Sequence, residues 1–301
     1  MARIAYKEQR FQRKTLDTIA RANSIIDSFT KDGYKLTVRQ LHYQMVVRNW
    51  QENTQKAYRN LSQVISDARY AGMVDWDNIE DRGRPVHRQS HWDNPGDILE
   101  SAAASFTVDK WNGQAYQPEV WIEKEALIGV IEPICERWDI SYFACKGYAS
   151  TSCAYDAAQR LDGYYCNLGR YPIILYLGDF DPSGEDMSRD LLERMRMFNV
   201  TVDLRRLALN PEQIKRYNPP PQMVKKDDSR TRKFVERNGG ECWELDALGP
   251  DVIIKLIDNE IRQSIDPVVW QKQVEREREG RELLKHEAGD YFSNVSEKWL
   301  F

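Results

Sequence analysis

Hydrophobic positions follow one pattern over the first eighty residues of this chain and another after residue 116. Between residues 4 and 29, apolar side chains recur at three- and four-residue steps, which predicts one or two amphipathic helices ending at Lys31-Asp32-Gly33. Thr37 is a candidate cap for a helix over residues 38–46, and a third helix is expected over residues 54–71. Short strands at residues 73–76 and around Ile79 would follow. Three helices and a small hairpin are typical of a winged helix-turn-helix, a common DNA-docking module.

After residue 116 the pattern changes to short continuous apolar runs that alternate with helical periodicity. Residues 120–122 and 173–177 have the composition of strands buried on both faces, and further strands are expected at 140–145 and 200–207. Helices are expected between these strands, and the tail from residue 250 onward is helical. This alternation predicts an α/β fold with a mainly parallel sheet and a helical C-terminal extension. We therefore divide the chain into residues 1–95, a linker at 96–115 with a helix around 97–105, and residues 116–301.

Acidic residues stand where two of the predicted strands end. Glu123 directly follows the strand at 120–122, and Asp179 and Asp181 follow the strand at 173–177. If the strands are parallel neighbours, these three side chains meet in the crevice beyond the carboxyl ends of the strands. Carboxylate oxygens of this kind suit Mg²⁺, with Mn²⁺ as an alternative. Glu244 and Asp246, further along the chain, are weaker candidates to extend the same acidic site.

These acidic motifs resemble a known family. A Glu closing one strand and an Asp-x-Asp closing a later one are similar to the Toprim domain of topoisomerases, primases and certain nucleases. The fuller stretch GDFDPSG at residues 178–184 most resembles the A subunit of topoisomerase VI and its relatives, among them the meiotic double-strand-break transesterase. The order of a winged-helix domain and then Toprim is the same. The shorter length resembles the compact stand-alone relatives called topoisomerase mini-A.

A segment of the N-terminal module also resembles this family. TVRQLHYQ at residues 37–44 is similar to the segment in which an Arg precedes the DNA-attacking tyrosine by four positions. The resemblance implies that Tyr43 is the nucleophile and Arg39 an assisting cation. Residues i and i+4 share a helix face, so a guanidinium there is within reach of the attacked phosphate. The sequence departs from the family at His42, where members commonly carry a second tyrosine; a nearby base and a packing residue are both open interpretations.

The resemblance implies a Mg²⁺-dependent transesterification in which Tyr43 becomes linked to the 5′ end of cleaved double-stranded DNA. Breaking both strands needs two sites, so a homodimer is expected, with the tyrosine of one protomer serving the metal site of the other by family analogy. No ATPase signature is found in the sequence, so strand passage would require a separate B-type ATPase subunit. Two alternatives stay open: a Toprim endonuclease in which water attacks, and a DNA-binding module with a degenerate site.

Charge is distributed unevenly along the chain. The net charge is −4, yet residues 1–90 hold 16 Lys and Arg against 10 Asp and Glu, a balance of +6, which leaves −10 for the other 211 residues. This asymmetry fits a module that faces phosphates joined to an acidic module that binds metal, and a solvated basic surface explains it almost as well. Candidate DNA contacts lie in the polar stretch that begins near Arg82, in the turn at 146–152 and in the proline-rich segment at 218–234: Arg82, Arg84, Arg88, Lys146, Ser150, Lys225, Lys226 and Arg230.

Composition narrows the class of protein further. The chain has 301 residues, of which 41% are hydrophobic and 30% charged, enough for one large or two modest domains with proper cores. Five cysteines without a C-x-x-C pair argue against a disulfide framework and a zinc site. No apolar run approaches the roughly 18 residues that span a bilayer, and the start lacks a signal-peptide core. We therefore expect a cytoplasmic protein with no membrane association.

Overall fold

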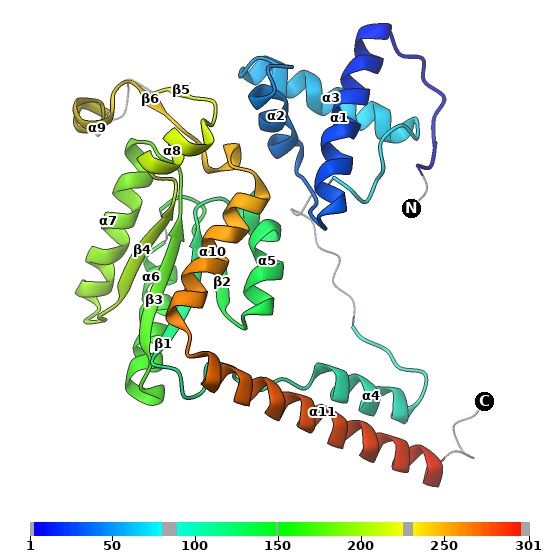
Figure 1. Cartoon of the computed structure of the whole chain (residues 1–301), viewed down its shortest axis with the longest axis vertical. Coiled ribbons are helices and arrows are strands. Elements are labelled where there is room, and N and C mark those ends of the chain that lie inside the picture. The colour runs from blue at the N-terminus through cyan, green and yellow to red at the C-terminus, as the bar shows by residue number, and fades with distance from the viewer. Residues whose placement is uncertain (1–2, 80–88, 149, 225–230, 296–301) are drawn as a thin grey trace.

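The first seventy residues fold into three helices, as the hydrophobic pattern predicts (Figure 1). The computed structural model describes residues 3–79, 89–148, 150–224 and 231–295. The three helices α1 (Arg13–Lys31), α2 (Val38–Val47) and α3 (Gln55–Tyr70) share one buried apolar cluster. Thr37 caps α2 in a full capping box: its hydroxyl accepts from the Gln40 N–H at 3.2 Å, and its own N–H donates to Gln40 Oε1 at 2.9 Å. The predicted start of this helix is confirmed.

The hairpin expected after α3 does not form in the described residues. Residues 72–78 are turns and bends, and Ile79 makes only an isolated parallel bridge with Leu36. Local side chains explain the difference, because Asp75 Oδ1 accepts from the Asp77 N–H and the Arg69 guanidinium donates to the carbonyl of Trp76. The prediction of a strand at residues 73–76 is therefore wrong, and the winged-helix assignment is not confirmed.

Four parallel strands form the central sheet in the order β2-β1-β3-β4, which confirms the α/β class. Neighbouring strands β1 and β3 pair along their whole length, with Ile122 opposite Leu177 at their carboxyl ends. Both are continuous apolar runs because both faces of the sheet are covered. The strands are β1 (Tyr116–Ile122), β2 (Ser141–Ala144), β3 (Tyr171–Leu177) and β4 (Asp203–Ala208).

Helices cover the sheet on both faces, so this part of the molecule has three layers (Figure 1). α5 (Ile128–Arg137) and α10 (Pro250–Ser264) lie on one face; α6 (Thr151–Leu168) and α7 (Pro182–Met197) lie on the other. Alternate strand residues belong to the two cores, as the strand period of two requires. The C-terminal extension therefore begins with a helix that caps the sheet.

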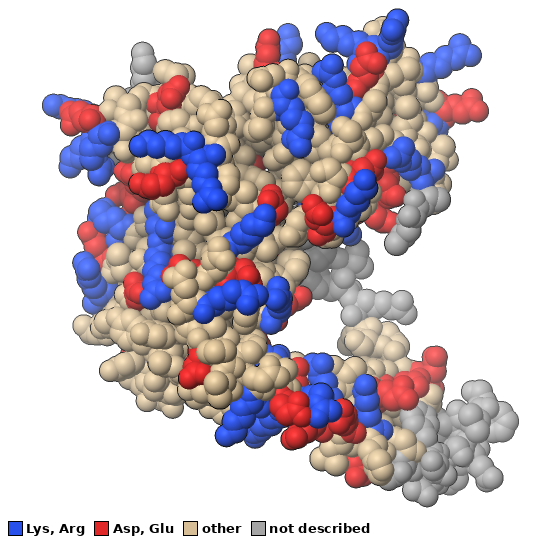
Figure 2. Space-filling model, viewed as in Figure 1, with Lys and Arg blue, Asp and Glu red and all other residues tan. Residues whose placement is uncertain are grey.

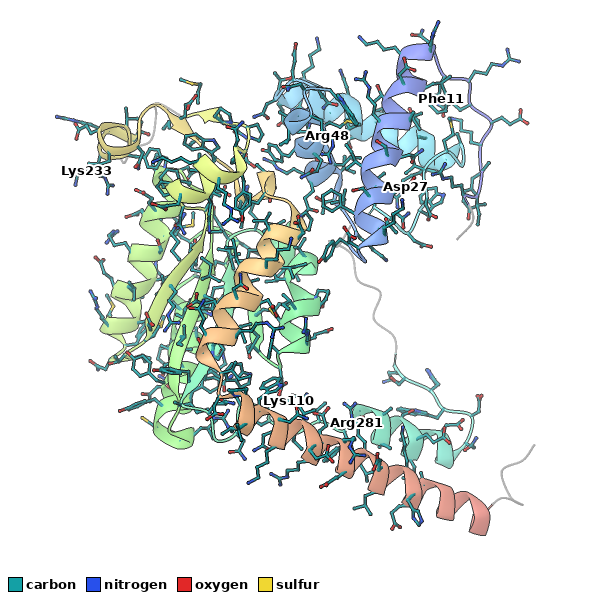
Figure 3. All side chains as sticks on the ribbon, in the orientation of Figure 1. Phe11, Asp27, Arg48, Lys110, Lys233 and Arg281 are labelled. Carbon is teal, nitrogen blue, oxygen red and sulfur yellow. The ribbon has the colours of Figure 1, made fainter. Side chains whose placement is uncertain are left out.

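The last helix leaves the sheet and packs elsewhere. α11 (Pro267–Val295) and α4 (Pro95–Ser105) lie side by side and project away from the strands (Figure 1). At the base of this pair, where Figure 3 labels Lys110 and Arg281, Lys110 Nζ lies 2.8 Å from Glu277 and the Arg281 guanidinium donates to the Phe106 carbonyl at 2.8 Å. The segment predicted as a linker thus contains the expected helix, held against the C-terminal tail.

Short elements cover the carboxyl end of the sheet. β5 (Gln222–Met223), in the proline-rich segment, pairs antiparallel with β6 (Glu241–Cys242). Residues 225–230 of the proline-rich segment lie outside the described residues. Within the described part of the chain, none of the helices has the length and apolar character to cross a membrane. The short elements are η1 (Glu125–Leu127), α8 (Pro211–Tyr217), β5 (Gln222–Met223), α9 (Thr231–Asn238), β6 (Glu241–Cys242) and η2 (Leu245–Ala247).

Candidate active site

The three acids predicted from the strand ends line one cavity of about 740 Å³. Glu123 follows β1, Asp179 lies two residues past β3, and Asp181 is the N-cap of α7, where its Oδ1 accepts from the Gly184 N–H at 2.6 Å. Because β1 and β3 are parallel neighbours, the first two acids meet: Glu123 Oε2 accepts a hydrogen bond from the Asp179 N–H at 2.9 Å. The sequence-based placement of these side chains in one crevice is confirmed.

Two glycines allow the acidic loop to close tightly. A Cβ added at Gly178 would lie 2.9 Å from Glu123 Oε2, and a Cβ at Gly184 would lie 2.2 Å from the Asp179 carbonyl oxygen. At Gly184 the close atom is backbone, so a larger residue would force the loop to open; at Gly178 it would force the side chains of Glu123 and Tyr176 to shift. The two glycines of GDFDPSG therefore let the loop close against the Asp179 carbonyl and Glu123.

Lys124 lies in the middle of the carboxylates. Its Nζ is 3.0 Å from Asp179 Oδ1, 2.9 Å from Glu244 Oε2 and 3.7 Å from Asp246 Oδ2. Burial alone would lower the pKa of Lys124, but the attraction of Asp246, Asp179 and Glu244 raises it above its ordinary value. The cavity thus contains a permanent cation from the chain itself.

Burial shifts the acids in the direction of the neutral form. Burial is the main cause that raises the pKa of Asp179 to about 7, and repulsion from Glu123 adds to the rise. Two effects oppose it: the positive charge of Lys124, and the Leu245 N–H, which donates to Asp179 Oδ1 at 2.8 Å. Burial likewise raises the pKa of Glu123. A cation bound beside Asp179 and Glu123 would stabilise their ionised forms.

The donor chemistry of these acids fits Mg²⁺, although no three Asp, Glu, His or Cys side chains in the described residues converge into a ready-made metal site. Glu123 Oε1, Asp179 Oδ2 and Asp181 Oδ2 accept no hydrogen bond from the described residues. Mg²⁺ is usually held by one or two carboxylates, with water and substrate phosphate in the other positions, so Glu123 and Asp179 are sufficient in kind. The Lys124 ammonium, held against Asp179, would compete with the ion.

Tyr43 is buried behind other side chains rather than open to the cavity. It is 2% exposed, and its hydroxyl oxygen accepts from Gln222 Nε2 at 2.9 Å. The same Gln222 amide donates to Glu244 Oε1 at 2.9 Å. Burial, followed by the repulsion from Glu244, raises the pKa of Tyr43 above its ordinary value. The predicted nucleophile is therefore close to the acidic cluster of its own chain but covered.

Arg39 lies on the same face of α2 as Tyr43, as the four-residue spacing predicts, with its guanidinium carbon 5.8 Å from the centre of the Tyr43 ring. Its partners are carboxylates: it forms an ion pair with Glu244, and its Nε lies 3.0 Å from Asp246 Oδ2. Because these acids hold Nη2 and Nε, a phosphate that binds the same two nitrogens must displace them.

His42 packs in the core of the N-terminal module. It is 4% exposed, and its Nδ1 is hydrogen-bonded to Gln51 Nε2 at 2.6 Å. Burial and then the positive charge of Arg39 lower the pKa of His42, so its neutral form is favoured. Of the two interpretations of this residue, the packing role is the one that its contacts support.

The predicted DNA contacts have different outcomes. Lys146 lines the cavity and forms an exposed ion pair with Glu125 at 2.8 Å. Ser150 caps α6 by accepting from the Cys153 N–H at 3.2 Å, which accounts for it as a capping residue. On the face that Figure 2 shows, basic and acidic side chains are interspersed over the N-terminal helices. The other candidates lie outside the described residues: Arg82, Arg84, Arg88, Lys225, Lys226 and Arg230.

Sequence reasoning missed Lys124 and Gln222, and it underrated Glu244 and Asp246. For Lys124 the sequence did hold a signal: it stands between Glu123 and Glu125 at the end of a predicted strand. A single basic residue among acids at such a position is expected to form ion pairs with them. Gln222 has no comparable signal, because its site contacts, Tyr43 and Glu244, lie 179 and 22 residues away along the chain.

Comparison with known proteins adds no relative: no family model matches the chain, and no curated protein matches it.

Proposed function

We propose that this chain is a Mg²⁺-dependent DNA-cleaving transesterase of the type IIB topoisomerase A-subunit kind. One observation carries the proposal. The cavity at the carboxyl ends of β1 and β3 is lined by Glu123, Asp179 and Asp181, and Gln222 and Glu244 connect it to Tyr43 by hydrogen bonds. The parallel α/β sheet is compatible with a Toprim domain, and the three N-terminal helices are compatible with a DNA-docking module.

In the proposed reaction the Tyr43 oxygen attacks a DNA phosphorus. A bond forms between that oxygen and phosphorus, the bond from phosphorus to the 3′ oxygen breaks, the phenol gives up its proton, and the departing 3′ oxygen takes one up. Arg39 and Lys124 supply positive charge beside the phosphate once it has displaced Glu244. Mg²⁺, when bound through Glu123 and Asp179 with Asp181 beside them, supplies further stabilisation of the phosphoryl charge.

The partners follow from the reaction. The substrate is double-stranded DNA, and cutting both strands needs two sites, so we propose a homodimer. Strand passage would require a separate ATPase subunit. The link through Gln222 between Tyr43 and Glu244 of the same chain supports a site built within one protomer, in contrast to the exchange of tyrosines between protomers that family analogy implies.

A second candidate is a metal-dependent endonuclease in which water attacks the phosphorus. The observation in its favour is the burial of Tyr43, whose hydroxyl is covered by Gln222 and whose raised pKa opposes formation of the phenolate. Under this candidate Tyr43 supports the helix, and the acids around Lys124 perform the same metal-dependent role.

The experiment that separates these candidates is a cleavage assay with end-labelled supercoiled DNA and Mg²⁺ or Mn²⁺, stopped with detergent. We expect label covalently attached to the wild-type protein, and a loss on the order of 100-fold or more in both Tyr43→Phe and Asp179→Ala. Tyr6→Phe and Asp251→Ala are matched controls, because Tyr6 is 68% exposed and Asp251 forms only an exposed ion pair with Lys255; both should cleave normally.

Other outcomes decide against the transesterase. Free cleaved ends that persist in Tyr43→Phe and vanish in Asp179→Ala would establish the hydrolytic nuclease. Binding of DNA with no cleavage under any metal would leave a DNA-binding module and contradict both candidates.

A further inference from the structure

Arg206 is a half-buried arginine of β4 that the proposed reaction does not use. Because side chains alternate along a strand, Arg205 and Arg206 point to opposite faces of the sheet. Arg205 binds acids on its face, with Nε 2.7 Å from Asp203 and Nη1 2.6 Å from Glu260. Arg206 has no carboxylate within ion-pair distance among the described residues. Two neighbouring arginines thus have opposite kinds of environment.

The partners of Arg206 are neutral oxygens, and most belong to the acidic loop. Nη2 donates to the carbonyls of Asp179 at 2.5 Å and Gly178 at 3.3 Å, and Nη1 donates to the carbonyl of Gly184 at 3.0 Å. Weaker bonds reach Ser188 Oγ and the Leu209 carbonyl, each at 3.4 Å. One side chain therefore joins both ends of the loop that carries Asp179 and Asp181.

The Asp179 carbonyl has a particular need for this donor. It accepts no backbone N–H among the described residues, and its oxygen lies so close to Gly184 that a Cβ there would be 2.2 Å away. A buried carbonyl without a donor destabilises the fold. Without Arg206 the loop would rearrange to satisfy this oxygen, and both acids would move with it.

The loop has other anchors, and they hold different atoms. Gly178 pairs with the end of β4 by donating its N–H to the Ala208 carbonyl, and Phe180 forms a two-bond bridge with Trp243. These bonds hold the start of the loop and the residue between its two acids. Arg206 binds different atoms, the carbonyls of Asp179 before that residue and of Gly184 in the first turn of α7.

The half-buried Arg206 guanidinium is held by neutral oxygens alone among the described residues. Desolvation lowers the pKa of Arg206, while attraction to Tyr176, Glu123 and other nearby groups opposes the shift. The contacts that fix the position of this side chain are therefore mainly those with the loop carbonyls.

We propose that Arg206 is a positioning residue of the acidic site: through the Gly178, Asp179 and Gly184 carbonyls it holds the loop in the shape that keeps Asp179 and Asp181 beside Glu123, where a cation can bind. This inference rests on the proposed function for the identity of the cation, but the fixing of the loop is independent of it.

The test compares Arg206→Met, which keeps length and loses charge and donors, with Arg205→Met on the other face of the same strand. Hydrogen exchange of the peptide covering residues 178–185 and calorimetric titration with Mg²⁺ alone are measured on the full chain. We expect Arg206→Met to exchange at least about 10-fold faster in this peptide and to bind Mg²⁺ about 10- to 100-fold more weakly. Arg205→Met should match the wild type in both readouts.

A third variant keeps the experiment decisive if Arg206→Met does not fold. Arg206→Lys retains the charge but has one donor group in place of a fork, so it should fold and still show faster loop exchange and weaker Mg²⁺ binding. Unchanged loop exchange in the folded variants would overturn the role of Arg206, even where the wild type cleaves DNA. If the wild type binds no Mg²⁺ in the titration and Asp179→Ala gives the same result, the proposed function fails. The hydrogen exchange of residues 178–185 then decides by itself whether Arg206 positions the loop.

Discussion

At the scale of single residues, the tightest contact near the cavity is the approach of Gly184 to the Asp179 carbonyl. A methyl group at Gly184 would lie 2.2 Å from that oxygen, and the oxygen is backbone, so it cannot move cheaply. We expect Gly184→Ala to lower the free energy of unfolding by about 2–3 kcal/mol, because the loop must open to admit the methyl group. Urea unfolding measures this difference.

Gly163 is the matched control at the same scale. It lies inside α6, and a Cβ there would be 3.6 Å from Asn167 Nδ2, an ordinary contact. Gly163→Ala should therefore raise the stability by about 0.5–1 kcal/mol, since alanine restricts the unfolded chain and favours a helix. Equal stability of Gly184→Ala and the wild type would show that the acidic loop is more open than the contact implies.

At the scale of elements, α2 carries both Arg39 and Tyr43, so the start of this helix determines where they lie. The Thr37 and Gln40 side chains satisfy each other's backbone N–H groups there. Thr37→Ala should cost about 1 kcal/mol in urea unfolding. Thr18→Ala is the comparison: its hydroxyl bonds only to the Lys14 carbonyl within α1, so its loss should be neutral or slightly stabilising. A Thr37→Ala protein as stable as Thr18→Ala would contradict the importance of the cap.

Elements were predictable from the sequence where a local pattern specifies them. The helix cap at Thr37, the apolar spacing in α1 to α3 and the apolar runs of β1 and β3 are patterns of a few neighbouring residues. The elements that these patterns predict are present in the structure. The hairpin at 73–76 failed because Asp75 and Arg69 bind the local backbone in turns. The packing of α4 on α11 could not be predicted, since it joins segments as far as 175 residues apart.

The candidate site divides in the same way. Glu123 and Asp179 were predictable because the carboxyl ends of parallel strands share one edge of a sheet. The contact of Lys124 with Glu244, 120 residues away, has no local signature. Arg206 was beyond reach for another reason: its acceptors are backbone carbonyls, which every residue has, so no residue type marks them.

At the scale of the whole molecule, Glu244 joins the N-terminal helices to the sheet domain. Its carboxylate receives Arg39 from α2, Lys124 from the end of β1 and Gln222 from β5. Asp246 adds a second acid against Arg39. Under the proposed function a DNA phosphate needs the same two cations, so its binding would compete with the contact between the two parts.

This contact makes the stability of the molecule depend on pH through Glu244. Burial opposes its ionisation, but the attraction and hydrogen bonds of Lys124 and Arg39 prevail and lower the pKa of Glu244 to about 2. Its folded-state pKa lies below its unfolded value of 4.5, so its contribution is fully present above about pH 4.5 and is lost as the pH falls through about 2. The shift corresponds to at most about 3 kcal/mol.

Glu244→Gln removes this contribution together with the repulsion by which Glu244 helps to raise the pKa of Asp246, whereas Asp179, whose raised pKa acts in the opposite direction, is present in both proteins. We expect the wild type to be more stable than Glu244→Gln at about pH 6, and the difference to shrink towards about pH 3 in urea unfolding. Glu282→Gln, which removes only an exposed pair with Arg278, should show neither effect. A difference that stays constant with pH would mean that Glu244 is not ionised against Arg39 and Lys124, and the competition between this carboxylate and a DNA phosphate would lose its physical basis.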